Sequence, residues 1–137
     1  MENKTNSNVK KLSQPKKLTG EQKQQENRNI KKQKVQETIA ILKKRFPIAF
    51  KENPEPLKVG ILEDVLEKLQ GKIPKRNIKD ALKYYTRSLL YHQAVLINTH
   101  RIDLEGKRCE LITPRQKEYS QKGLGMILAQ NQQMHED

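Results

Sequence analysis

The sequence predicts a mainly α-helical domain with a small β-hairpin, an α+β fold, preceded by a disordered basic arm. Apolar residues in several segments recur at spacings of three and four, which is typical of helices that bury one face. A later segment instead alternates around a glycine turn, which is typical of a hairpin. The N-terminal segment shows neither pattern and is rich in Lys, Gln and Asn, which predicts disorder.

The length of the chain favours one modest domain with flexible ends. Its 137 residues leave room for only one core large enough for independent stability. We expect a disordered arm at residues 1–34, a folded domain at residues 35–130 and a short tail at residues 131–137.

Charge is the strongest indication of a partner. The chain has 28 lysines and arginines against 16 aspartates and glutamates, a net charge of +12, and such a surface favours a polyanion. Ten of these cations and only three of these acids lie in residues 1–34. The arm is therefore either a solubilising tail or an electrostatic arm that contacts phosphates.

Several other classes of protein and site are not indicated. No segment has the length to span a membrane or the pattern of a signal peptide, so we expect a cytoplasmic protein. Cys109 is the only cysteine, which excludes an intramolecular disulfide. His92, His100 and His135 lack the close spacing of metal ligands. We therefore expect no metal, no cofactor and a monomer.

The folded domain begins with two amphipathic helices. Pro47 ends the first and Gly71 ends the second, and a proline-containing connector lies between them. Their apolar faces are formed by Val35, Ile39, Leu42 and Phe46 in the first helix and by Leu62, Val65, Leu66 and Leu69 in the second.

A third helix, starting near Pro74, has an apolar side and a cationic side. The apolar side holds Ile78, Leu82, Tyr85 and Leu89, and the cationic side holds Lys75, Lys79, Lys83 and Arg87. Like charges four residues apart destabilise a helix by roughly 0.2–0.5 kcal/mol per pair, and phosphates along a nucleic acid would offset that cost. The alternative is an ordinary solvated face.

The tyrosines of this region fall into two groups. Tyr85 lies within the apolar arc and is expected in the core, whereas Tyr84 and Tyr91 lie elsewhere on the helix. Both are candidates for stacking on unpaired bases. Either can instead place its ring in the core and its hydroxyl at the mouth of a pocket.

A hairpin and a capped helix complete the domain. Residues 95–104 and Cys109–Leu111 flank a turn at Gly106, which predicts two short strands. Thr113 and Gln116 form a capping box that predicts the start of the last helix.

The start of this last helix is a candidate phosphate site. Its unpaired N–H groups lie near Lys107, Arg108 and Arg115 in sequence. Farther along, Gly123 and Gly125 weaken the helix by about 1 kcal/mol each relative to alanine.

No catalytic site is predicted. Ser88 and His92 lie four residues apart on a helix, but no acid is placed to orient the histidine. Glu63, Asp64 and Glu67 are typical of a solvated helix face. The glycines are isolated, so no phosphate-binding glycine loop is formed.

Several motifs, in series, resemble the ProQ/FinO domain. The opening of that domain resembles residues 45–47 (RFP) with Phe50 and residues 56–61 (PLKVGI). Its central helix and hairpin resemble residues 81–86 (ALKYYT), Tyr91 and residues 101–106 (RIDLEG). The resemblance covers about residues 35–121. The chain resembles a minimal member, with a basic arm before the domain.

The resemblance implies an RNA chaperone domain without catalytic activity. Such domains prefer structured RNAs, especially terminator hairpins with a single-stranded uridine tail and a free 3′ end. A pocket on a concave face takes the terminal nucleotides, and cations and a helix N-terminus hold the stem. By position, the resemblance implies that the pocket includes Lys58, Tyr91 and Arg101 and that the basic face includes Lys75, Lys79 and Lys83.

We therefore hypothesise a non-enzymatic protein that binds structured RNA and acts in post-transcriptional regulation. The candidate RNA-binding residues are Lys58, Lys75, Lys79, Lys83, Tyr84, Arg87, Tyr91, Arg101, Lys107, Arg108, Thr113 and Arg115. One alternative is a general basic DNA-binding protein of the nucleoid type. Another is an adaptor that docks on acidic proteins.

Overall fold

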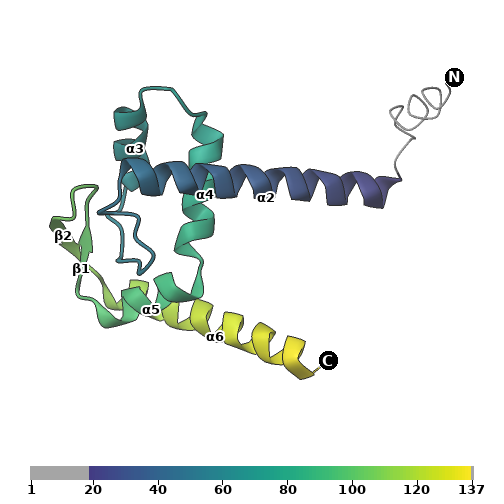
Figure 1. Ribbon diagram of the computed structural model, residues 1–137. Coiled ribbons are helices and arrows are strands. Elements are labelled where there is room, and N and C mark those ends of the chain that lie inside the picture. The colour runs from purple at the N-terminus through teal and green to yellow at the C-terminus, as the bar shows by residue number, and fades with distance from the viewer. Residues whose placement is uncertain (1–18, 137) are drawn as a thin grey trace, which may run out of the picture. The chain divides into compact units, whose positions relative to one another are not determined.

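The computed structural model describes residues 19–136, and for residues 133–136 it describes the backbone only. The described residues form two compact units, one up to residue 33 and the other from residue 34 onward. In chain order the elements are α2 (Gly20–Arg45), α3 (Ile61–Leu69), α4 (Lys75–Thr86), α5 (Leu89–Ile97), β1 (His100–Ile102), β2 (Arg108–Leu111) and α6 (Pro114–Glu136) (Figure 1). The described residues thus form a mainly helical fold with one small hairpin, which confirms the predicted fold class.

Helix α2 begins earlier than the apolar pattern predicts. The Gln22 N–H donates to Thr19 Oγ1 (3.1 Å) and the Thr19 N–H donates to Gln22 Oε1 (2.9 Å), which satisfies amides that a helix start leaves unpaired. The Gln, Lys and Glu residues that follow have high helix propensity. This corrects the expectation of disorder for residues 20–34, which are helical with exposed side chains.

The predicted division into arm, domain and tail stays a prediction. Residues 1–18 of the predicted arm lie outside the described residues. At the other end, α6 continues to Glu136, so the described backbone shows no break at residue 130.

The core of the second unit is built from the apolar faces predicted for the first three helices. Val35, Ile39 and Leu42 of α2 are buried, and the connector adds Phe50. The largest fully buried side chains are Leu42, Leu69, Ile78, Val65, Val95 and Pro56. Burial of each such aliphatic side chain contributes roughly 1.5–3 kcal/mol to folding. Tyr85 also lies in this core, as predicted.

The predicted third helix is two helices. Ser88 ends α4 and starts α5, because its Oγ donates to the Tyr85 carbonyl (3.0 Å) and accepts from the Tyr91 N–H (3.2 Å). Serine favours such a helix boundary because its hydroxyl competes for backbone groups. Arg87 is therefore the C-cap of α4 and not the fourth member of a helical row of cations.

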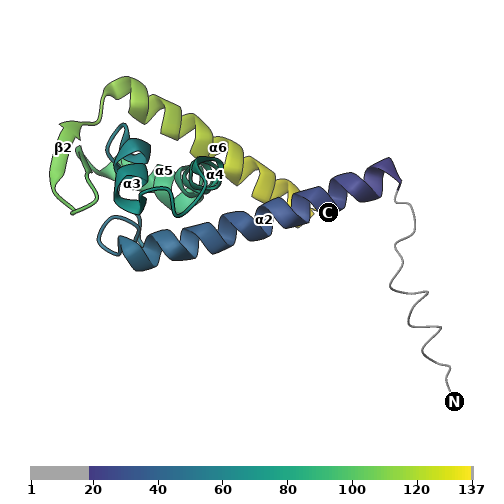
Figure 2. The same cartoon turned by 90° about the horizontal axis from the view of Figure 1, so that it is seen from above.

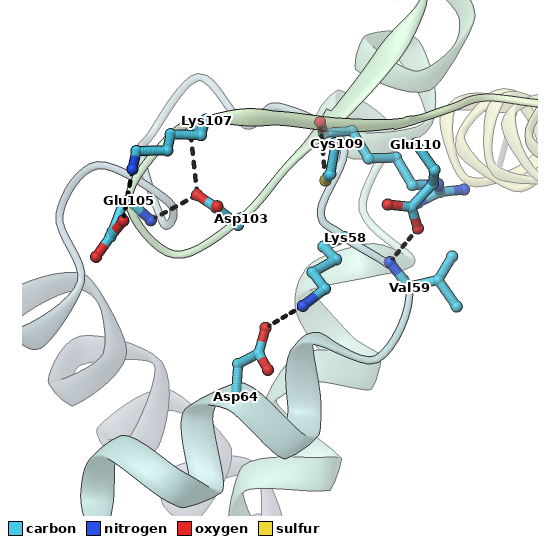
Figure 3. A network of polar contacts seen from close by, with 9 residues as sticks. Lys58, Val59, Asp64, Asp103, Glu105, Lys107, Cys109 and Glu110 are labelled. Atoms are coloured by element: carbon cyan, nitrogen blue, oxygen red, sulfur yellow. Dashed lines mark hydrogen bonds and ion pairs between the residues drawn. The ribbon is translucent and has the colours of Figure 1, made fainter.

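The predicted hairpin forms, with β1 and β2 paired antiparallel, but residues 95–97, which were expected in its first strand, belong to α5. Its turn is closed by Asp103, whose Oδ1 accepts hydrogen bonds from the Glu105 and Lys107 N–H groups (2.9 Å each) (Figure 3). These bonds, from Lys107 foremost, lower the pKa of Asp103. Gly106 adopts φ 84°, and a Cβ there would lie 2.5 Å from Ile48 Cγ2, so the turn requires glycine.

The segment before α3 lies beside β1. The Ile102 N–H donates to the Pro56 carbonyl and the Lys58 N–H donates to the Ile102 carbonyl, both at 2.8 Å. Leu57 and Ile102 form a parallel bridge. Lys58 and Arg101 are thereby brought to the same region of the fold, although they are far apart in sequence.

The last helix packs along α5. Both views show α6 running beside α5 (Figures 1 and 2), and the two helices are in contact. The predicted capping box starts α6: the Gln116 N–H donates to Thr113 Oγ1 (3.1 Å) and the Thr113 N–H donates to Gln116 Oε1 (2.9 Å). One turn later, Lys117 Nζ donates to the Leu96 carbonyl (3.0 Å) near the end of α5.

Candidate nucleic-acid interface

A cavity of about 490 Å³ lies within the second unit. Its walls come from α4, α5, α6, β1 and the segment around the start of α3. The lining residues are Leu57, Lys58, Val59, Ile61, Lys83, Thr86, Arg87, Tyr91, His92, Val95, Arg101, Arg115, Gln116, Tyr119 and Ser120. This volume is typical of pockets that hold a small ligand, so it suits a few nucleotides rather than a duplex.

The charge of the cavity has one sign. Its cations are Lys58, Lys83, Arg87, Arg101 and Arg115, and the described lining residues include no aspartate or glutamate. A concave wall with charge of one sign concentrates counter-ions, because apolar walls focus the field into the opening. The cavity therefore favours a polyanion.

Tyr91 and Arg101 hold the backbone of Leu57 from two sides. The Leu57 N–H donates to the Tyr91 hydroxyl and Arg101 Nη1 donates to the Leu57 carbonyl, both at 2.8 Å. Only 5% of the Tyr91 surface is exposed, so its ring belongs to the core, although the residue also contributes to the cavity wall. Burial raises the pKa of Tyr91, so the hydroxyl stays protonated at neutral pH.

Arg101 also has an unused donor. Among the described residues no partner accepts from its buried Nε. A buried donor without an acceptor costs about 1–3 kcal/mol. The Nη1 bond to the Leu57 carbonyl fixes the guanidinium at the cavity wall, and a guanidinium suits the oxygens of a phosphate.

Lys58 enters the cavity already paired. Its Nζ lies 2.9 Å from Asp64 Oδ2 (Figure 3), and this hydrogen bond raises the pKa of Lys58. Asp64 is half-buried, so the expectation that it belongs to a purely solvated acidic face is wrong. A phosphate must compete with the carboxylate for Lys58.

The structure brings together half of the predicted RNA-binding residues. Six of them line the cavity, namely Lys58, Lys83, Arg87, Tyr91, Arg101 and Arg115. The others lie outside it, namely Lys75, Lys79, Tyr84, Lys107, Arg108 and Thr113. Lys75 and Lys79 lie on earlier turns of α4 than Lys83, and Tyr84 is exposed without lining the cavity.

The RNA-binding residues predicted in the hairpin and at the start of α6 either bond to other residues or are exposed. Lys107 Nζ lies 3.5 Å from Glu105 Oε1 in the turn (Figure 3). Arg108 is exposed on β2, and Thr113 Oγ1 accepts from Gln116 in the capping box.

Sequence reasoning missed the part of the cavity that α5 and α6 share. His92, Gln116, Tyr119 and Ser120 all line it. The spacing of Arg115 and Tyr119, four residues apart after a capped helix start, was a usable indication that they share a face. Nothing in the local sequence indicated which turn of α5 meets that face.

His92 is the buried centre of this part. Its Nδ1 lies 3.2 Å from Ser120 Oγ, and its ring contacts the Tyr119 ring at 6.2 Å between centroids with an interplanar angle of 63°. Burial lowers the pKa of His92, which favours the neutral ring. A Cβ on Gly123 would lie 2.6 Å from His92 Nε2, so glycine allows the ring to pack on α6.

The described part of the chain contains neither a metal-ion site nor a helix suited to cross a membrane. No group of three or more His, Cys, Asp or Glu residues there could hold a metal ion. None of the described helices combines the length and apolar character needed to cross a membrane.

The fold and the cavity define a class of protein, a basic and mainly helical α+β domain with a cationic pocket. The model of the ProQ/FINO family matches residues 32–137. The chain therefore belongs to the ProQ/FinO family, as its motifs predicted.

Individual relatives agree with this assignment. The RNA chaperone ProQ of Idiomarina loihiensis is 32% identical over 117 residues, which is 82% of this chain and 50% of that protein. This chain thus spans about half the length of that relative. Among solved structures, a ProQ homolog from Legionella pneumophila is similar with a TM-score of 0.56 and 28% identity, covering 82% of this chain and 88% of that one.

A second solved structure supports the fold alone. A FinO-like RNA chaperone from Neisseria meningitidis is similar with a TM-score of 0.58 and 20% identity, covering 66% of this chain and 93% of that one.

Proposed function

We propose that this chain is a non-enzymatic RNA chaperone that binds structured RNA through the cationic cavity. Its preferred ligand is a hairpin with a single-stranded 3′ tail, as in an intrinsic terminator. The observation that carries the proposal is the cavity wall, which contains five cationic residues and Tyr91 but no carboxylate among its described lining residues. The family and the similarity to the RNA chaperone ProQ of Idiomarina loihiensis support it.

The tail and the stem would use different residues. The cavity has the size of a small-ligand pocket, so the unpaired end of the strand enters it and the duplex stays outside. Arg101 and Tyr91 are fixed on Leu57 and would orient the terminal sugar or phosphate. Lys83, Arg87 and Arg115 would contact the phosphates of the tail.

The stem would lie along the exposed cations outside the cavity. Lys75 and Lys79 precede Lys83 on successive turns of α4 and are exposed, so they continue the positive surface from the cavity onto the helix. Lys107 and Arg108 of the hairpin and the start of α6 at Thr113 would add contacts to the RNA backbone. Such contacts depend on shape and charge and carry little sequence preference.

We further propose that the chain acts as a monomer in the cytoplasm, in post-transcriptional regulation. The exposed cations of residues 20–34 would add affinity for RNA of any sequence, because each phosphate contact releases counter-ions.

A competition experiment tests the proposed function. A labelled RNA hairpin with a 3′ tail is bound to the full chain, and unlabelled tailed hairpin, blunt hairpin and duplex DNA of equal length are added in turn at several salt concentrations. We expect the tailed hairpin to compete best at every salt concentration. Equal competition by duplex DNA would instead support a general DNA-binding protein. Equal competition by the blunt hairpin would show that the tail does not contribute to binding.

A further inference from the structure

The cavity wall contains one exposed tyrosine on α6, whereas its other tyrosine, Tyr91 of α5, is buried. Tyr119 of α6 lines the cavity and leaves 66% of its surface exposed. Its neighbour His92 of α5 is only 4% exposed. An aromatic ring that is exposed at the wall of a cationic cavity provides a surface on which a planar base can stack.

The ring of Tyr119 is supported from behind. Its ring makes an edge-to-face contact with the His92 ring, with 6.2 Å between centroids and an interplanar angle of 63°. The His92 ring is in turn held by Ser120, whose Oγ lies 3.2 Å from Nδ1, and by close packing on Gly123. A side chain that is already supported loses less conformational freedom when a ligand binds.

A cation accompanies this ring. Arg115 lies four residues before Tyr119 on α6, so the two side chains lie on the same face of the helix and line the same cavity. Arg115 can therefore hold a phosphate of the strand whose base lies on Tyr119.

We propose that Tyr119, supported by His92, is a stacking subsite for one unpaired base of the bound RNA strand, separate from the part of the cavity formed by Tyr91 and Arg101. This subsite rests on the proposed function, because it requires that a single strand enters the cavity. It assigns a contact role to Tyr119 and a positioning role to His92. It also explains why an aromatic side chain stays exposed at this place in the fold.

The experiment uses the full chain and a tailed RNA hairpin that carries 2-aminopurine at one tail position at a time, with a blunt hairpin as the reference ligand. The variants are Tyr119→Ala and Tyr119→Phe. Met126→Ala is the control, because Met126 lies on the same helix as Tyr119 and is equally exposed (66%) but does not line the cavity.

We expect binding to quench the fluorescence of one tail position most strongly and Tyr119→Ala to restore that signal. Tyr119→Ala should weaken binding of the tailed hairpin roughly 5- to 100-fold, the range for one lost aromatic stack, and leave the blunt hairpin unchanged within about two-fold. Tyr119→Phe and Met126→Ala should bind like the parent chain. An abasic nucleotide at the quenched position should abolish the effect of Tyr119→Ala, because the stacked base is then already absent.

Two outcomes would overturn the subsite. If Tyr119→Ala weakens the tailed and blunt hairpins equally, or if its effect adds in full to that of the abasic nucleotide, Tyr119 does not stack on a base. A failure of the proposed function gives a different result, because the parent chain itself would then bind tailed and blunt hairpins equally or would bind no RNA. In that case the stacking subsite would also be wrong.

Discussion

The lysines along α4 and the cations around Leu57 carry the same charge but are held in different ways. Lys75, Lys79 and Lys83 are exposed, and their side chains have no ion-pair partner among the described residues. Lys58 is paired with Asp64, and Arg101 is bonded to the Leu57 carbonyl. An exposed lysine contributes a long-range, salt-dependent attraction, whereas a fixed guanidinium contributes direction. We therefore expect the first group to determine how strongly any RNA binds and the second to determine which RNA end is accepted.

The largest effect should come from changing the geometry of Arg101 while keeping its charge. Arg101→Lys removes the planar group whose Nη1 bonds the Leu57 carbonyl. Because a hydrogen bond to a charged group contributes about 1.5–3 kcal/mol, we expect roughly 10- to 100-fold weaker binding of the tailed hairpin. The dependence of binding on salt should not change, since the charge is retained.

The matched control for Arg101→Lys is Lys79→Arg, which alters the shape of an exposed cation and should bind as the parent chain does. Titrations of the tailed hairpin at several salt concentrations measure both affinity and slope. A tailed-hairpin affinity that survives Arg101→Lys would show that the cavity uses only the charge of Arg101.

The two glycines of α6 also differ in how closely other side chains pack against them. Gly123 and Gly125 are both helical, but a Cβ on Gly123 would meet the buried His92 ring at 2.6 Å, whereas a Cβ on Gly125 would meet nothing within 4 Å. Alanine stabilises a helix interior by about 1 kcal/mol relative to glycine. Forcing a group into a packed contact costs about 1–3 kcal/mol.

Gly125→Ala should therefore raise the free energy of unfolding by up to about 1 kcal/mol, and Gly123→Ala should lower it by about 1 kcal/mol. Urea unfolding followed by circular dichroism measures both variants. If both substitutions stabilise the chain equally, His92 does not pack on α6 as described.

The sequence predicted the helical faces, the hairpin and the cap of α6 because each depends on local spacing. Val35, Ile39 and Leu42 are buried where their period placed them, and Thr113 caps the last helix. The same reasoning failed at Ser88, where continued periodicity on both sides concealed a helix boundary made by one hydroxyl. It also failed for residues 20–34, because helices without an apolar face have no period to detect.

The cavity was only partly predictable for a related reason. Lys58 and Arg101 came from family resemblance, since the bridge between Leu57 and Ile102 that brings them together is a long-range pairing. His92 and Tyr119 face each other only because α6 folds back along α5. Local patterns do not contain such tertiary contacts.

A smaller effect should separate exposed lysines from the paired one. Lys79→Ala and Lys83→Ala should each reduce the slope of log affinity against log salt by about one unit, as expected when one phosphate contact is lost. Lys58→Ala should reduce it less, because Asp64 already compensates its charge.

Asp64→Asn sharpens this comparison because it leaves Lys58 in place and removes its partner. We expect it to raise RNA affinity several-fold, because Lys58 is then free to contact a phosphate. The same RNA titrations measure it. Equal slope changes for all three lysine variants would mean that the ion pair does not restrain Lys58.

The smallest expected effect is a pH dependence of stability that comes from His92. Its pKa in the folded chain is lowered from 6.5 by burial, so the unfolded chain binds the proton more readily. The contribution of His92 to the free energy of unfolding is thus complete above about pH 6.5 and declines as the pH falls through its folded pKa. His92→Gln keeps a polar group beside Ser120 and should reduce the loss of Tm between about pH 7.5 and pH 5.5.

His100→Gln provides the control for this last measurement, because His100 lies on β1 and does not line the cavity. The carboxylates of Asp103 and Glu110, whose pKa values are lowered, titrate below this window and do not interfere. A Tm difference that persists in His92→Gln and disappears in His100→Gln would assign the titration to the hairpin. Such a result would also contradict the proposal that a buried, uncharged His92 supports the Tyr119 ring.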